Sequence, residues 1–164
     1  MRYVLLAMLS ACMPLAAFAA EKGRETGLPT PRFVSLKSNE INMRKGPGTR
    51  YPIEWVYRRA RLPVEVMEEF GHWRRVQDVD GSSGWLHKNM LSGARTIITN
   101  ENDVTYVMEQ PAEDASRVAK LELGVIATLQ ACELEWCRIK LGEVEGWLEK
   151  STFYGAYAKE LYNP

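Results

Sequence analysis

From residue 33 onward, apolar and polar positions alternate over short stretches that are interrupted by turn residues. Residues 64–67 and 74–77 have this period of two, and Gly71 and the glycine- and serine-rich run 80–84 mark the turns that follow them. Only residues 115–123 have a period that also fits a helix, and they align with a strand-like segment nearer the N-terminus. The pattern predicts an all-β protein built from short antiparallel strands.

The same succession of segments occurs twice, at a spacing of 62 or 63 residues. The matching pairs are residues 62–66 and 125–129, Trp73 and Trp136, and the Gly-Trp-Leu runs at 84–86 and 146–148. Self-similarity of this kind indicates two copies of one compact unit. We therefore expect two tandem antiparallel barrels, the first over residues 33–95 and the second, more divergent, over residues 96–164.

The N-terminus has the features of an export signal. Residues 3–20 carry no charge and follow the single positive charge of Arg2, and small residues occupy positions 17 and 19. This pattern predicts a secretory signal peptide over residues 1–19 that is cleaved after Ala19. The mature chain is then periplasmic or secreted, and we expect no membrane span.

An alternative processing route starts from residues 9–12, Leu-Ser-Ala-Cys, which resemble the lipobox of bacterial lipoproteins. In that case Cys12 would be acylated and would become the new N-terminus. The short apolar run before Cys12 and the apolar residues after it favour cleavage without lipid. Residues 20–32, rich in glycine, proline and charge, are expected to be a flexible lead to the first barrel.

Two cysteines, Cys132 and Cys137, remain in the expected mature chain. Outside the cytosol an even pair of cysteines indicates a disulfide before it indicates a metal site. The two residues flank a predicted hairpin tip, but Cys132 is out of step with the alternation of Ala127 and Leu129. We expect a Cys132–Cys137 disulfide, with a bulge that brings both side chains to one face.

Charge balances over the whole chain, with 21 lysines and arginines against 21 aspartates and glutamates. A dedicated nucleic-acid binder needs a clustered cationic excess, so we expect no nucleic-acid partner. The division is uneven, because residues 33–95 contain 11 basic and 7 acidic side chains and residues 96–164 contain 6 and 12. The two copies are thus expected to attract each other or oppositely charged partners.

Several motifs of the first copy occur together in the order typical of a known family. They are Asn-Met-Arg-Lys-Gly-Pro-Gly at 42–48, Tyr-Pro at 51–52, Leu-Pro-Val-Glu-Val at 62–66, Gly-His-Trp at 71–73 and Gly-Ser-Ser-Gly-Trp-Leu at 81–86. With these motifs the first copy resembles the bacterial SH3-like domain. The second copy has Tyr-Val-Met-Glu-Gln-Pro at 106–111 in place of the Asn-x-Arg-x-Gly-Pro motif, which leaves its ligand binding in doubt. Residues 153–157 resemble the ending of periplasmic members that carry two such domains.

The resemblance implies a five- to seven-stranded barrel that binds cell-wall peptide or protein partners, often beside a murein hydrolase. The function expected on this basis is a periplasmic recognition module for peptidoglycan peptide or a wall-associated protein. One alternative is an adaptor in the envelope that holds an extended segment of another protein without binding peptidoglycan. Another is a structural role with no ligand.

The residues themselves give a further reason for binding, because Trp55, Trp73 and Trp85 are a heavy aromatic load for one small barrel. A barrel of so few strands cannot enclose three indoles. At least one of them is therefore expected on the surface as a contact site. Trp73 is favoured because it alternates with the core-facing residues 74 and 76. The alternative for each indole is that it caps a barrel end and only stabilises the fold.

Arg44 and Tyr51, from the long loop motif, complete the set of ligand-binding candidates with the three tryptophans. Arg44 either projects toward a carboxylate of a bound peptide or, together with Asn42, bonds the backbone of residues 46–48 and holds the loop in shape.

Candidate catalytic groups are sparse. His72 and His87 have no cysteine or serine at a suitable partner position, and no histidines or cysteines have metal-site spacing. The carboxylates at 68–69 and 143–145 fall in predicted turns and are interpreted as solvated tips rather than a catalytic pair. We expect a protein that is not an enzyme and that has no metal and no cofactor.

Overall fold

The computed structural model of the chain describes residues 21–100 and 104–164. Regular structure in these residues is β-strand apart from two short 3-10 helices, η1 (Lys88–Met90) and η2 (Lys150–Thr152). The all-β fold class is therefore confirmed. The expected signal peptide, its cleavage point at Ala19 and the alternative lipid anchor at Cys12 lie outside the described residues.

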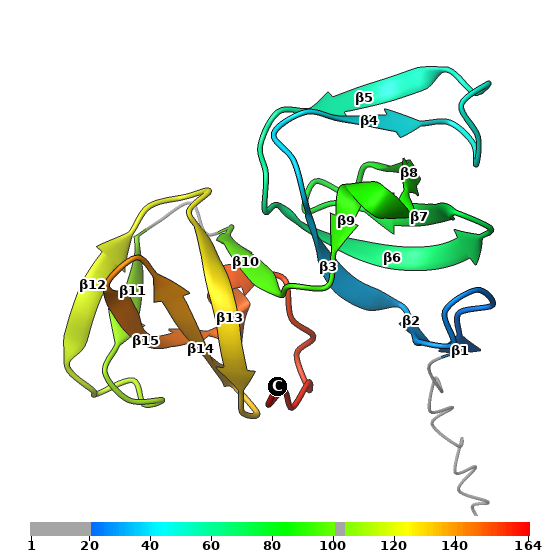
Figure 1. The fold of residues 1–164 in the computed structure, drawn as a ribbon. Coiled ribbons are helices and arrows are strands. Elements are labelled where there is room, and N and C mark those ends of the chain that lie inside the picture. The colour runs from blue at the N-terminus through cyan, green and yellow to red at the C-terminus, as the bar shows by residue number, and fades with distance from the viewer. Residues whose placement is uncertain (1–20, 101–103) are drawn as a thin grey trace, which may run out of the picture.

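The first copy is a seven-stranded antiparallel sheet that curls around its own core (Figure 1). Its strands are β3 (Arg32–Leu36), β4 (Ile41–Arg44), β5 (Ile53–Tyr57), β6 (Pro63–Phe70), β7 (Trp73–Gln77), β8 (Ser83–His87) and β9 (Leu91–Ser92). Their order in space is β5-β4-β8-β7-β6-β3-β9, so the sheet ends at β5 on one side and at β9 on the other.

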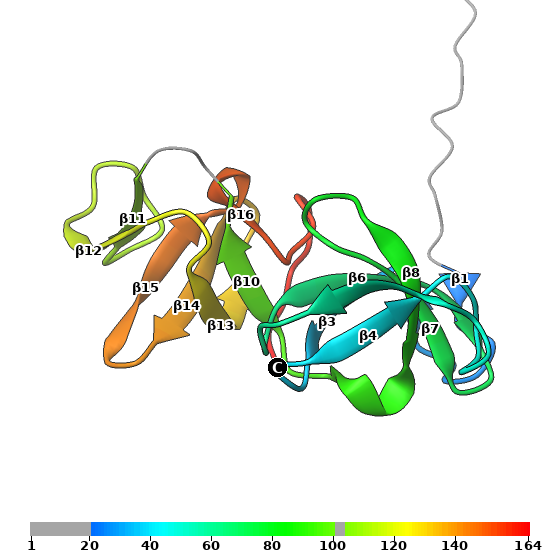
Figure 2. The same cartoon turned by 90° about the horizontal axis from the view of Figure 1, so that it is seen from above.

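The second copy repeats this arrangement strand for strand. Its strands are β10 (Thr96–Thr99), β11 (Thr105–Met108), β12 (Arg117–Leu121), β13 (Ile126–Cys132), β14 (Trp136–Leu141), β15 (Val144–Glu149) and β16 (Phe153–Tyr154). They are ordered β12-β11-β15-β14-β13-β10-β16, and Figure 2 shows the two sheets next to each other. The tandem repeat predicted from the spacing of the tryptophans is confirmed.

The two cores use equivalent positions of the repeat. Fully or almost fully buried side chains that correspond between the copies are Val66 and Leu129, Val76 and Ile139, and Leu86 and Leu148. A Cβ at Gly84 would lie 2.9 Å from the backbone oxygen of Arg44, and one at Gly146 would lie 2.5 Å from that of Met108. The close approach of the strands explains why each copy has glycine directly before the tryptophan of its Gly-Trp-Leu run.

The N-terminal residues differ from the flexible lead that we expected over residues 20–32. Strands β1 (Glu21–Lys22) and β2 (Pro29–Thr30) form a small antiparallel hairpin that continues into β3. The turn of this hairpin is fixed to the first barrel, since the backbone amides of Glu25 and Thr26 both donate to Glu69 Oε2 at 2.9 Å. These hydrogen bonds to a residue far away in the sequence order the segment, and its local composition does not reveal them.

Cys132 and Cys137 form a disulfide, as predicted. They pair directly across β13 and β14, and the register of these strands shifts between Leu129 and Ala131. This shift is the bulge that the alternation of residues required, because it brings Cys132 into line with Cys137 on the buried face.

The two copies pack against each other through aromatic side chains, and the C-terminal segment runs between them (Figure 1). Phe33 of β3 contacts the rings of Tyr154 and Tyr157, with centroids 5.0 and 4.8 Å apart. The Tyr157 hydroxyl donates to Glu65 Oε1 at 2.6 Å, and the Arg95 guanidinium lies 5.6 Å from the centroid of the Phe33 ring. The short segment between β9 and β10 is thus reinforced by side chains from both copies.

None of the helices in residues 21–100 and 104–164 has the length and apolar character needed to cross a membrane.

Candidate functional site

One cross-strand row on the outer face of the first sheet places a tryptophan between two arginines. Trp85 on β8 pairs in register with Arg75 on β7 and with Arg44 on β4. Directly opposed residues of antiparallel strands share one face, with Cβ atoms about 5 Å apart. Leu86, the neighbour of Trp85, is fully buried, so the row points outward. Glu68 on β6 ends the row and forms an exposed 2.7 Å ion pair with Arg75.

Trp73 lies in the next row of the same face, where it pairs with Phe70 and His87. Its ring meets the His87 ring edge-on with centroids 5.5 Å apart, and the side chain is half-buried. Phe70, by contrast, is 62% exposed. Trp73, the residue expected to be the exposed indole, is therefore partly covered by an imidazole, whereas Phe70, next to the turn predicted at Gly71, offers a free aromatic ring.

The most exposed of the three candidate indoles is Trp55, with 56% of the residue accessible. Trp55 pairs with Met43, the residue before Arg44 on β4. Successive residues of a strand point to opposite faces, so Trp55 cannot join the row that contains Arg44 and Trp85. The structure thus separates Trp55 from the other candidates.

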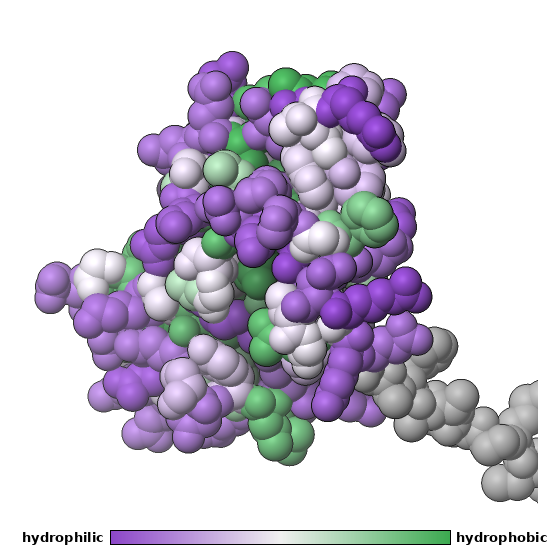
Figure 3. All heavy atoms as spheres, turned by 45° about the vertical axis from the view of Figure 1, so that its right-hand side comes forward, coloured by the Kyte–Doolittle hydropathy of each residue, from purple (hydrophilic) through white to green (hydrophobic). Residues whose placement is uncertain are grey.

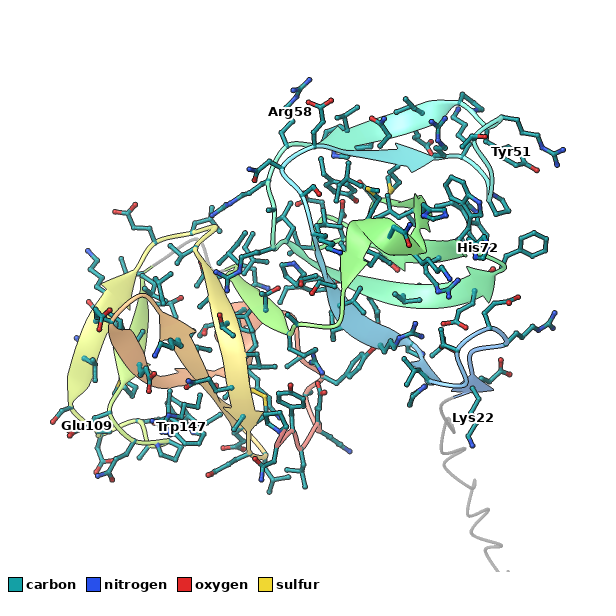
Figure 4. All side chains as sticks on the ribbon, viewed as in Figure 1. Lys22, Tyr51, Arg58, His72, Glu109 and Trp147 are labelled. Carbon is teal, nitrogen blue, oxygen red and sulfur yellow. A yellow bond between two sulfur atoms is a disulfide. The ribbon has the colours of Figure 1, made fainter. Side chains whose placement is uncertain are left out.

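Arg44 holds the loop that precedes β5. Its Nη1 donates to the backbone oxygen of Tyr51 at 2.8 Å and to that of Thr49 at 3.2 Å. The Tyr51 ring lies so close to Gly46 that a Cβ there would approach it to 2.5 Å. The loop-holding role left open by the sequence is the one that these bonds support. Arg44 is also the cross-strand partner of Trp85, and Figure 4 places Tyr51 at the same end of the first copy as His72.

A hollow of about 410 Å³ opens beside this row, between the N-terminal hairpin and the strands β6 and β8. Trp85, Phe70 and Met67 line it from the sheet, and Lys22 and Arg24 line it from the hairpin. In Figure 3, polar residues cover most of the visible side of the molecule and apolar residues form separate small patches between them. The hollow combines apolar surface with charges of both signs, because Glu21 and Glu68 line it beside Lys22 and Arg24. The hairpin that we had expected to be flexible supplies one wall of it.

Glu69 lines the bottom of the hollow, and its side chain has no exposed surface. Burial alone raises the pKa of this carboxyl, but hydrogen bonds from the Thr26 hydroxyl, from Arg32 and from backbone amides outweigh it and lower the pKa to about 2. The carboxylate is therefore ionised and structural. The interpretation of residues 68–69 as solvated tips is wrong for Glu69, which is buried on β6, although Glu68 is exposed.

The second copy has only part of this arrangement. Trp147 pairs with Arg138 on one side, but the other side has the buried apolar residue Met108 in place of an arginine. Arg138 in turn donates to Glu145 Oε2 at 3.2 Å. Glu133 stands at the position of Phe70, so the exposed aromatic ring is missing as well. This agrees with the loss of the loop motif that put ligand binding by the second copy in doubt.

Two residues of the site, Phe70 and Arg75, are not among the five ligand-binding candidates, although the sequence marked Arg75, together with Arg74, as part of a basic pair suited to anionic ligands. Arg75 could have been found, because it is two residues from Trp73 on a predicted strand and must share its face. Phe70 could not, because the predicted strand ended at residue 67, whereas β6 extends to Phe70 and its register shifts between Val66 and Glu68, which changes the face on which the ring lies.

Metal-ligating side chains do not gather here. Within residues 21–100 and 104–164, no three histidine, cysteine, aspartate or glutamate side chains come together as they would around a metal ion. His72 and His87 do lie together, with ring centroids 5.9 Å apart, and His87 Nδ1 accepts a hydrogen bond from the backbone amide of Asn89.

Comparison with known proteins identifies the repeat. The family model described as "Bacterial SH3 domain" matches residues 37–93 and again residues 103–155, one match on each sheet. A relative from Bacillus subtilis (strain 168), YrvJ, is 23% identical over 124 residues, and its name proposes that it is an N-acetylmuramoyl-L-alanine amidase. The match covers 69% of this chain but only 24% of YrvJ.

Among solved structures, NlpC2 and NlpC1 from Trichomonas vaginalis each align with a TM-score of 0.36 and 11% identity. The alignments cover 77% and 82% of this chain, and 49% of each of those chains. The chain therefore spans less than half the length of each relative and each solved structure named here.

Proposed function

The chain belongs to the bacterial SH3 domain family, and from this premise we propose that it is a non-catalytic binding module of the cell envelope, periplasmic or secreted. Its ligand is the peptide of peptidoglycan, bound on the outer face of the first copy. The observation that carries the proposal is the position of Trp85 between Arg75 and Arg44. The second copy, which lacks the matching arginine, supports the first copy and binds no peptide of its own.

The chemistry of the face suits such a ligand. Wall peptides present carboxylates and small apolar side chains to a binding surface. Arg75 is exposed and Arg44 is fixed by its loop, so both can attract a carboxylate. Trp85 and Phe70 supply aromatic surface for the apolar groups, and the hollow beside them is large enough for a short peptide segment.

The name of the relative YrvJ supports a ligand of the cell wall, because N-acetylmuramoyl-L-alanine amidases are named for a bond in peptidoglycan. The amidase activity is not carried over, since the chain spans only 24% of that protein. The non-catalytic part of the proposal is supported by the ring contacts of the histidines, since His72 lies beside His87, and His87 meets the Trp73 ring edge-on.

Co-sedimentation with purified insoluble peptidoglycan tests the proposal. Trp85→Ala and Phe70→Ala should each weaken the affinity for peptidoglycan at least about fivefold, since truncation of a central aromatic residue typically costs 1 kcal/mol or more. Phe70 is exposed, so its removal leaves the fold intact. The matched controls are Trp147→Ala, at the equivalent position of the second copy, and Leu134→Ala, an equally exposed apolar residue there.

Retention of the wild-type protein on peptidoglycan together with loss in the two first-copy variants supports the proposal. If Trp147→Ala releases the protein as strongly as Trp85→Ala, the assignment to the first copy is wrong. If the wild-type protein stays in the supernatant, the wall ligand is wrong, and the alternative of an adaptor for another envelope protein takes its place.

A further inference from the structure

A second hollow lies at the other end of the first copy, away from the face that carries Trp85. It has a volume of about 360 Å³ and is lined by Trp55, Tyr57, Leu62, Pro63, Asp78 and Asp80. Figure 4 shows this end at Arg58, the residue after β5, whereas Tyr51 and His72 mark the opposite end. The exposed indole that the peptidoglycan site does not use thus has a site of its own.

We propose that this hollow and the free edge of β5 bind an extended segment of another protein that carries a lysine or arginine. The segment adds as a strand beside β5 and places its basic side chain against Trp55 and Asp80. This inference goes beyond the proposed function, since it involves neither Trp85 nor the wall peptide.

The first support is the position of β5 at the end of its sheet. In the residues that the structure describes, β5 pairs only with β4, so its other edge offers unpaired backbone groups. Ile53, Glu54 and Trp55 along it are exposed. An exposed edge strand invites pairing with another chain, and proteins ordinarily protect such edges with charged side chains, of which β5 has one, Glu54.

The second copy shows that protection at the equivalent edge. Its terminal strand β12 carries Arg117 and Lys120, both exposed, and Arg117 lies over the Tyr106 ring at 3.9 Å. The corresponding strand of the first copy has no lysine or arginine between Ile53 and Tyr57. The two copies therefore differ at this edge, because two cations lie along β12, whereas the single charge of β5, on Glu54, has the sign that attracts a basic segment.

The third support is the charge of the hollow. Asp78 Oδ2 accepts from the Tyr57 hydroxyl at 2.8 Å, and its Oδ1 accepts from the backbone amides of Asp80 and Ser82, which fixes the turn. The Asp80 side chain at the tip of this turn is exposed. Arg58, the cation that also lines the hollow, is directed to Glu40 at 3.6 Å. A cation on the incoming segment then finds an aromatic face and two carboxylates in one place.

The test uses two blocked octapeptides, one of alternating lysine and valine and one in which glutamate replaces each lysine. Each is titrated into the full chain labelled with nitrogen-15, and the backbone amides of residues 53–57 and the indole N–H of Trp55 are followed by NMR. We expect the lysine peptide to shift these resonances and the glutamate peptide to leave them unchanged. Trp55→Ala and Asp80→Asn should each weaken binding about tenfold. Both side chains are exposed, so the fold is retained.

The matched controls are Arg117→Ala on the edge of the second copy and Phe70→Ala on the wall-peptide face, neither of which should change the affinity. The proposal is overturned if the lysine peptide fails to shift β5, if the glutamate peptide binds equally well, or if the shifts appear at Trp85 instead. It is also overturned if sedimentation shows a dimer that Trp55→Ala dissociates, because the occupant of the edge would then be a second copy of this chain. Peptidoglycan binding does not depend on Trp55, so the two proposals can fail separately.

Discussion

Glu69 and Arg74 face each other across β6 and β7, with Glu69 Oε1 3.4 Å from Arg74 Nε. At the equivalent positions of β13 and β14 the second copy has its disulfide between Cys132 and Cys137. Each pair also anchors a terminal segment. Glu69 binds the turn of the N-terminal hairpin, and the backbone of Cys132 exchanges two hydrogen bonds with Tyr162 near the C-terminus. The same position of the repeat thus holds a chain end in both copies. In the first copy the residue there belongs to an ion pair, and in the second copy it belongs to a disulfide.

The state of Glu69 predicts how the stability of the first copy depends on pH. Its pKa falls from 4.5 to about 2 on folding, so the folded chain binds fewer protons at this site than the unfolded chain. The resulting contribution, about 3 kcal/mol, is fully present above pH 4.5 and is lost as the pH falls toward 2. Urea unfolding between pH 6 and pH 2 measures it.

Glu69→Gln should remove most of this pH dependence and destabilise the protein by about 3 kcal/mol, because Arg32 and Arg74 lose their buried partner. Glu68→Gln is the matched control, since its exposed ion pair with Arg75 is worth less than about 1 kcal/mol. An equal loss of stability on acidification in wild type and Glu69→Gln would contradict the role given to Glu69.

The disulfide is predicted to stabilise the second copy modestly. It closes a loop of only a few residues between Cys132 and Cys137, for which the loss of entropy in the unfolded chain is worth about 2 kcal/mol. The double variant Cys132→Ser and Cys137→Ser should lower the free energy of unfolding by this amount, measured with urea. Reductant should lower the midpoint of the wild type and leave that of the double variant unchanged. A wild-type midpoint that is insensitive to reductant contradicts the prediction.

The aromatic contact between the copies predicts that they unfold together. Phe33→Ala removes a buried ring that contacts Tyr154 and Tyr157 and should cost about 3 to 5 kcal/mol. Calorimetry of the wild type should show one transition, and the variant should show two. Tyr157→Phe, which removes only the hydroxyl bond to Glu65, is the milder control and should keep the single transition. Two transitions in the wild type would show that the copies are not coupled.

The local sequence pattern was sufficient to predict the repeat and the strands, because alternation with a period of two and turn residues can be recognised within a few positions. It was also sufficient for the disulfide, where the parity of Cys132 required the bulge that the strands contain. It failed for the N-terminal segment, whose order depends on Glu69, more than 40 positions away. It also favoured Trp73 as the exposed indole, whereas Trp55 is the most exposed one, since the edge position of β5 and the contact of Trp73 with His87 are set by tertiary structure.

The central claim is that wall peptide binds the outer face of the first copy and leaves the second copy free. Titration of purified soluble peptidoglycan fragments into the nitrogen-15-labelled full chain tests it most directly, with the indole N–H resonances of Trp85 and Trp147 as paired reporters. We predict a saturable shift of the Trp85 indole and of the amides of Arg75 and Phe70, with Trp147 unmoved. A shift of Trp147 of the same size, or saturating fragment with no change at Trp85, would contradict it.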